Sequence, residues 1–154
     1  MDALHEDVPE NEGVDAEALD LALKALRHRD LSEAELDQRL AARGVAQAER
    51  TRALETVRRT GLLDESRFAH GRASALASRG AGDALVRDAL RRAGVPRETV
   101  ENAVSELDPE AERARQIVAR RGASPRTARY LAGKGFSPET VAAVVASETR
   151  DTLG

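Results

Sequence analysis

One pattern of residues occurs three times along the chain and restricts it to a repeated helical fold. Each copy has a helix-starting position, core-facing positions four and eight residues later, a glycine after twelve residues and an apolar residue next to that glycine. Spacings of four keep side chains on one face of an α-helix, and glycine is the usual left-handed residue after a helix end. The copies are Ser32-Leu36-Leu40-Gly44-Val45, Gly82-Val86-Leu90-Gly94-Val95 and Ala123-Thr127-Leu131-Gly135-Phe136.

The residues around each copy predict one helix before it and one after it. In the first repeat we expect helices over about residues 16–29, 32–44 and 46–59, and Ser32 with Glu35 has the spacing of a capping box. Alternating β-branched runs and Asn-Gly or Asp-Gly turns, which indicate strands and hairpins, are absent. The predicted fold class is all-α, with three tandem three-helix repeats that form an elongated, curved row.

The repeats predict how the chain is divided. We expect an acidic, disordered arm over 1–15, repeats over 16–60, 61–107 and 108–148, and a C-terminal tail over 149–154. The third helix of the first repeat is expected to end at Gly61, and Asp64 and Asp108 are the expected N-caps that open the second and third repeats.

Aromatic residues make up only 2% of the sequence, so aliphatic side chains must form the three cores. We assign Phe68 to the second core, and Phe136 and Tyr130 to the third. The chain has no cysteine, which excludes disulfides, thiolate catalysis and cysteine-based metal sites.

The formal net charge of −3 combines an acidic N-terminal region with a basic region later in the chain. Residues 1–15 contain six acidic residues and no lysine or arginine, so this arm either improves solubility or masks a basic surface. Between Arg113 and Lys134 the chain has seven basic residues and no acidic one. This window is a candidate contact surface for phosphate or for an acidic protein groove.

The sequence offers little for catalysis. The histidines His5, His28 and His70 are far apart, and Gly80-Ala81-Gly82 lacks the strand and the lysine of a phosphate-binding loop. We predict no enzyme activity, no cofactor and no metal site. No apolar run is long enough to span a bilayer, and no heptad seam is present. We therefore expect a soluble, cytoplasmic monomer.

Two motifs together resemble the RecX family, the bacterial regulators of the RecA recombinase. Gly61-Leu62-Leu63-Asp64-Glu65-Ser66-Arg67-Phe68-Ala69 is similar to the family's Gly-Tyr-Leu-Asp-Asp-x-Arg-Phe-Ala, and Arg79-Gly80-Ala81-Gly82 with Val86, Leu90 and Gly94-Val95 is similar to its Gly-x-Gly…Ile…Leu…Gly-Ile pattern. Arg29 to Leu36 also fits the pattern of the first repeat, and the resemblance covers about residues 18 to 146. Leu62 and Arg72 replace aromatic residues that are common in the family.

The resemblance implies a protein that lies in the helical groove of the RecA–DNA filament and lowers its ATPase, strand-exchange and coprotease activities. It would thereby modulate recombination, DNA repair and the SOS response. We predict the residues that contact RecA or DNA phosphate from the clustering of charge rather than from the family motifs. They are Arg79, Arg87, Arg91, Arg120, Arg121, Arg126 and Arg129.

Other functions stay open at this point. Three-helix units joined by short turns are also the parts of a helix-turn-helix module that acts on duplex DNA. Binding to bare single- or double-stranded DNA is equally undecided, and a metabolic enzyme without recognisable motifs is a third class.

Overall fold

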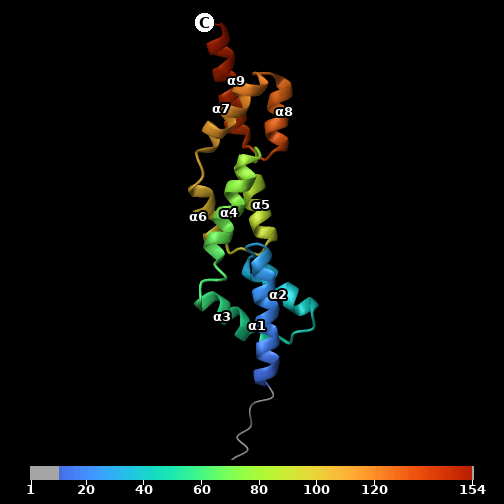
Figure 1. Ribbon diagram of the computed structural model, residues 1–154. Helices are drawn as coiled ribbons and strands as arrows, with labels where there is room; N and C mark the ends of the chain where they lie inside the picture. Colours follow the sequence, from blue (N-terminus) through green and yellow to red (C-terminus); the bar gives the residue numbers. More distant parts are fainter. Residues whose placement is uncertain (1–10, 154) are drawn as a thin grey trace, which may run out of the picture. The chain divides into compact units, whose positions relative to one another are not determined.

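The computed structural model describes residues 11–153 (Figure 1). Within this range the chain forms nine α-helices and no strand, so the predicted all-α class is confirmed. The helices are α1 (Asn11–His28), α2 (Glu33–Ala42), α3 (Gln47–Arg59), α4 (Glu65–Ser78), α5 (Asp83–Arg92), α6 (Arg97–Ser105), α7 (Glu110–Arg121), α8 (Pro125–Gly133) and α9 (Pro138–Leu153).

The number of helices over residues 11–153 is consistent with three per repeat, but the first and last helices extend beyond their predicted bounds. Helix α1 begins at Asn11, so residues 11–15 of the predicted arm are helical. There the carboxylate of Asp15 accepts hydrogen bonds of 3.0 and 3.1 Å from Nε of Arg52 on α3. Helix α9 continues to Leu153 through the predicted tail, because no glycine or proline interrupts it before Gly154. The rest of the predicted arm, residues 1–10, lies outside the described residues.

The chain divides into two compact units, residues 1–68 and 69–154, and the division falls within α4. The predicted repeat boundaries after residues 60 and 107 stay a prediction.

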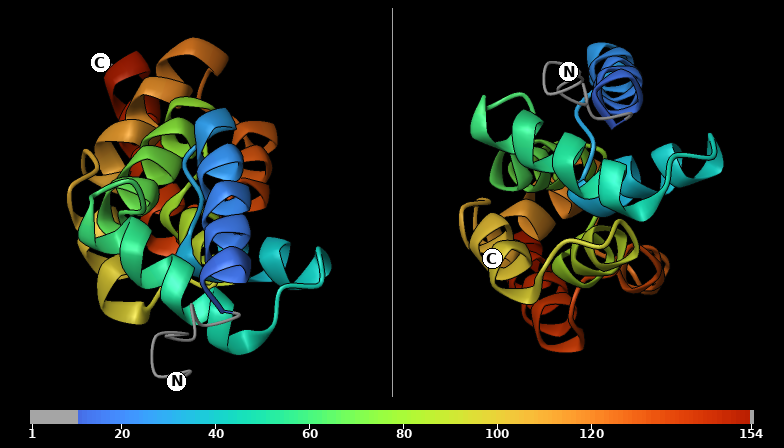
Figure 2. Two further views of the ribbon diagram at one scale, coloured as in Figure 1. Left: turned by 60° about the horizontal axis from the view of Figure 1, so that its bottom comes forward. Right: turned by 90° about the horizontal axis from the view of Figure 1, so that it is seen from below.

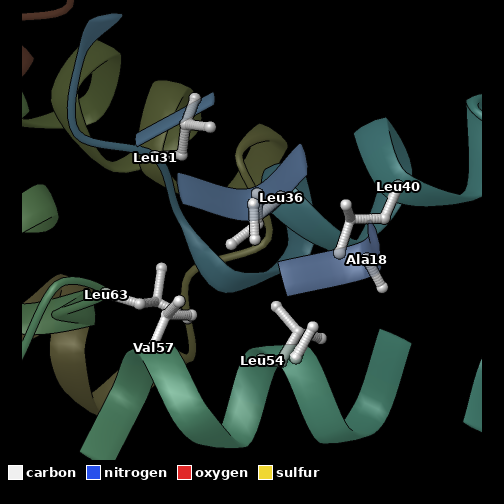
Figure 3. Packing of buried hydrophobic residues seen from close by; sticks show 9 residues of the cluster. Ala18, Leu31, Leu36, Leu40, Leu54, Val57 and Leu63 are labelled. Atoms are coloured by element: carbon white, nitrogen blue, oxygen red, sulfur yellow. The ribbon is translucent and has the colours of Figure 1, made fainter. Parts of the chain in front are cut away.

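In the first unit, α1 lies beside α3 and also packs on α2 (Figure 2). Figure 3 shows side chains from these helices and from the segments that follow α1 and α3 pointing toward one another. The cluster is wholly aliphatic, as expected for the first repeat, and consists of Ala18, Ala22, Leu31, Leu36, Leu40, Ala53, Leu54, Val57 and Leu63.

In the second unit, α7, α8 and α9 enclose a separate cluster. Phe136 and Leu131 are buried at its centre, and Tyr130 is partly buried against it. Both aromatic residues therefore belong to the core to which the sequence assigned them. The core face of α8 also follows the predicted spacing, because Thr127 and Leu131 are buried four residues apart.

Most predicted helix ends are confirmed. Ser32 forms the full capping box, in which its Oγ accepts from the N–H of Glu35 and the Glu35 carboxylate accepts from the N–H of Ser32. The Asp64 carboxylate accepts from the N–H of Arg67 at 3.0 Å, as an N-cap does. The four predicted C-terminal glycines have positive φ values: Gly44 82°, Gly61 78°, Gly94 80° and Gly135 90°.

Two predicted helix starts are each wrong by one residue, and proline explains both. Ser124, not Ala123, caps α8, because Pro125 lacks an N–H group and takes the first helical position. Pro109, not Asp108, precedes α7, and Asp108 instead offers its carbonyl oxygen to Arg113 at 2.9 Å.

The start of α5 packs directly on the backbone between α8 and α9. Gly82, the N-cap of α5, donates its N–H to the carbonyl of Lys134 at 2.8 Å, and Ala84 donates to Gly135 at 3.2 Å. A Cβ atom on Gly82 would lie 2.4 Å from the carbonyl carbon of Gly135, so the close approach excludes a side chain there.

One carboxylate joins the starts of three helices in the second unit. Glu110, the first residue of α7, accepts from the N–H of Asp83 at the start of α5 at 2.8 Å and from the N–H of Ser137 before α9 at 2.9 Å. Burial acts to raise the pKa of Glu110, but these hydrogen bonds outweigh it and lower the pKa below its ordinary value of 4.5.

Glu65 occupies the equivalent position at the start of α4 but is held less completely. Its carboxylate accepts from the N–H of Glu33, the first residue of α2, at 3.2 Å, while its second oxygen is buried without a hydrogen bond. Burial, with a smaller contribution from the nearby charge of Glu35, raises the pKa of Glu65. Hydrogen bonds from helix-start N–H groups therefore favour the ionised form of Glu110, which accepts two of them, whereas the one that Glu65 accepts does not offset its burial.

We predict that Gly82→Ala lowers the free energy of unfolding of the second unit by about 1–3 kcal/mol, because the added methyl group meets backbone that cannot move aside. Gly71→Ala in α4 is the control, since its Cβ would meet nothing within 4 Å, and it should stabilise by about 0.5–1 kcal/mol. Urea unfolding followed by the emission of Tyr130, the single tyrosine in a chain without tryptophan, measures both. Equal effects of the two substitutions would contradict the close approach.

We predict that Glu110→Gln costs about 1–3 kcal/mol at pH 7, because the amide can accept one of the two N–H groups but presents its own donors to the other. Since folding lowers the pKa of Glu110, its contribution is complete above about pH 4.5 and disappears as the pH falls through the lower folded-state value. The difference between wild type and variant should therefore shrink in acid. Glu65→Gln should cost far less at pH 7, and a cost as large as that of Glu110→Gln would refute the comparison.

Candidate interaction surface

The basic window between Arg113 and Lys134 is not all surface. Arg113 is only 8% exposed. Its guanidinium donates to the Asp83 carboxylate at 2.9 Å, to the carbonyl of Asp108 at 2.9 Å and to the carbonyl of Ala81 at 3.0 Å. Arg113 is therefore a structural residue, and the expected charge of the surface is one unit smaller than the count from the sequence.

Three of the nominated arginines line one cleft of about 350 Å³ in the second unit. Arg79 directly follows α4, while Arg120 and Arg121 end α7, so two helix ends supply the three guanidinium groups. Arg79 and Arg120 hold the same place in the sequence pattern, three residues before the second and third copies. The remaining residues of the lining are Ser78, Gly80, Ile117 and Tyr130.

Tyr130 of α8 forms part of the wall of this cleft. The guanidinium carbon of Arg121 lies 3.7 Å from the centre of its ring, which is a close cation–π contact. A Cβ atom on Gly80 would lie 3.8 Å from the Tyr130 hydroxyl and 3.8 Å from Cε of Lys134, so both side chains border Gly80. An aromatic ring and three arginines thus line one small opening, and a lysine lies near its glycine.

The electrostatics of the cleft favour an anion. Within the described part of the chain, Arg79, Arg120 and Arg121 form no ion pair with an acidic side chain. Arginine near a helix C-terminus is favoured by the helix dipole, which accounts for part of their presence. Because guanidinium groups bind carboxylate and phosphate through paired hydrogen bonds, the cleft fits either anion.

The other nominated residues are not in this cleft. Arg87 is paired with the carboxylate of Glu101 on α6 through two hydrogen bonds of 3.0 and 3.2 Å. Arg91 borders a different cleft beside α6, and Arg126 and Arg129 are exposed one turn apart on α8. The structure therefore brings three of the seven residues together.

A larger basic groove lies in the first unit, where no contact residue was predicted from the sequence. Leu21, Ala25, Leu40 and Ala42 form its apolar part, and its volume is about 750 Å³. Its basic residues come from two helices: Lys24, Arg27 and His28 from α1, and Arg39 and Arg43 from α2. The only hint of this groove in the sequence is the i, i+4 spacing of Arg39 and Arg43. Acidic residues nearby in the sequence make this segment look mixed in charge rather than basic.

Residues 11–153 hold no cluster of three or more histidine, cysteine or acidic side chains that could bind a metal ion. None of the helices in that range has the length and apolar character needed to cross a membrane. Over the described residues, the fold and these clefts define an all-helical protein with basic clefts.

No family model matches the chain, but individual proteins do. Regulatory protein RecX of Chromohalobacter salexigens is 33% identical over 142 aligned residues, and the match covers 86% of this chain and 93% of that protein. Regulatory protein RecX of Halorhodospira halophila is 31% identical over 150 residues, covering 90% of this chain and 93% of that protein. The chain therefore belongs to the RecX family of regulatory proteins.

Solved structures agree on the fold. The crystal structure of RecX from Lactobacillus salivarius superimposes with a TM-score of 0.78 at 12% identity and covers 90% of this chain and 98% of its own. A crystal structure of a regulatory protein RecX has a TM-score of 0.73 at 20% identity, and the match covers 85% of this chain and 72% of that chain. At these identities the likeness concerns the fold alone.

We predict that inorganic polyphosphate changes the emission of Tyr130, because an anion bound between Arg79, Arg120 and Arg121 alters the surroundings of the ring. Polyphosphate does not absorb where tyrosine does, so the signal reports the cleft directly. The double substitution Arg79→Glu with Arg120→Glu should weaken binding at least about tenfold, equivalent to ~1.4 kcal/mol. Arg115→Glu, an exposed arginine of the same helix outside the cleft, should leave it nearly unchanged. Equal losses in the two variants would show that the cleft is not the site.

Proposed function

We propose that this chain is a non-enzymatic regulator that binds the RecA–DNA filament and lowers its ATPase, strand-exchange and coprotease activities. Membership in a family of regulatory proteins supports the general role. The resemblance of the motifs at residues 61–69 and 79–95 to those of RecA regulators supports the particular target. By this proposal the protein acts in the cytoplasm, where such filaments form, and contributes contacts rather than chemistry.

The cleft of Arg79, Arg120 and Arg121 is the observation that carries this proposal. A nucleoprotein filament presents the two anions that the cleft fits, phosphates of the DNA and carboxylates of the protein. The cleft is small and open, so it suits a protruding group rather than an enclosed ligand. Arg126 and Arg129, exposed on the same helix as Tyr130, extend the basic surface beside it.

The direct test is the single-stranded-DNA-dependent ATPase of purified RecA. We expect inhibition at up to stoichiometric amounts of the protein, and the triple substitution Arg79→Glu, Arg120→Glu and Arg121→Glu should raise the half-inhibiting concentration at least about tenfold (~1.4 kcal/mol). Arg115→Glu is the matched control on α7. An ATPase and filament length untouched across salt concentrations would refute the proposal.

Binding to DNA without RecA separates this proposal from a helix-turn-helix function. For a DNA-binding module, affinity for bare duplex would fall steeply with salt and depend on base sequence. For a filament regulator, the same protein should bind the RecA-coated strand more tightly than the bare strand at every salt concentration. Sequence-dependent duplex binding tighter than filament binding would favour the module.

A further inference from the structure

The groove between α1 and α2 has an apolar base and a cationic rim. Leu40 is 1% exposed and closes the base, with Leu21 and Ala25 half-buried beside it. Arg39 and Arg43 come from the last part of α2 and its C-cap. A surface that combines aliphatic and cationic groups in this way suits a peptide that alternates apolar and acidic residues.

The rim is not neutralised by its surroundings. Lys24 pairs with Asp20 at 2.9 Å, but both side chains are more than half exposed. Among the residues that the structure describes, Arg27, Arg39 and Arg43 form no ion pair with an acidic side chain. Three arginines around one groove repel each other, and an anion between them would relieve this repulsion.

The chain itself contains a segment of matching chemistry. Residues 1–10 carry Asp2, Glu6, Asp7 and Glu10, with no lysine or arginine, and Leu4 and Val8 lie between these acidic residues. The segment thus has both kinds of side chain that the groove accommodates. It also precedes α1, the helix that forms one wall of the groove.

The segment is long enough to reach the groove. Along α1, Leu21 lies ten residues beyond Asn11, about 15 Å at 1.5 Å per residue, and His28 lies about 25 Å away. Ten extended residues span up to about 33 Å. A tethered ligand of this length has an effective concentration on the order of millimolar, so even a weak intrinsic affinity would fill the groove.

We propose that the acidic N-terminal segment, residues 2–8, binds back into the groove between α1 and α2 of the same molecule and covers its basic rim. This intramolecular contact goes beyond the proposed function and does not depend on RecA. It gives the acidic segment a defined site, and it means that an anionic partner of the first unit must displace the segment.

Pairs of introduced cysteines test this contact, because the chain has none of its own. Ala3→Cys is combined with Ala42→Cys, which lines the groove and is exposed, or with Ala48→Cys, an exposed position on α3 outside the groove. With the neutral compound diamide as the oxidant, we expect the first pair to form its disulfide at least fivefold faster at low salt. Nearby arginines also increase thiol reactivity, so each rate is divided by the rate of the same cysteine with neutral 2,2′-dithiodipyridine.

The advantage of the first pair should disappear at 1 M salt, and also in variants carrying Asp2→Asn, Glu6→Gln and Asp7→Asn or Arg39→Gln and Arg43→Gln. Circular dichroism confirms that each variant is folded. Equal normalised rates for the two pairs would overturn the proposal, as would an advantage that survives the charge substitutions. A rate that rises with protein concentration would also overturn it, because the groove would then receive the segment of a second copy.

Discussion

The second unit depends on the carboxylate of Glu110, which accepts N–H groups from the starts of both α5 and α9 while it begins α7 itself. A helix start exposes donors that its own backbone cannot satisfy, and here one anion accepts one N–H group from the start of each of two helices. The arrangement requires close packing, which the bare backbones of Gly82 and Gly135 allow. Arg113, one turn after Glu110, binds Asp83 on the same α5 start and so balances the charge buried there.

Arg113 and the cleft arginines belong to one basic window of the sequence but have opposite roles. At the start of α7, Arg113 finds a carboxylate and two carbonyl groups in the protein interior. At its end, Arg120 and Arg121 line an open cleft and have no acidic ion-pair partner in the range 11–153. Position along one helix therefore separates the residue that stabilises the fold from those available to a partner, although all three carry the same charge.

The distance along the chain between interacting residues decides which features of the structure can be predicted from the sequence. Local rules predicted the capping box of Ser32 and the left-handed glycines, because both depend on residues within one turn. They missed the burial of Arg113 and the pairing of Arg87 with Glu101, since the partners lie on other helices. The groove of the first unit was missed for the same reason: its cations come from two helices and meet only in the folded unit.

Lys134 connects two features of the second unit. Its carbonyl accepts the N–H of Gly82 at the start of α5, while its side chain borders Gly80 at the edge of the arginine cleft. The backbone carbonyl of Lys134 holds the start of α5 whatever its side chain is. A change of side chain at this position therefore alters the edge of the cleft and spares the hydrogen bond to Gly82.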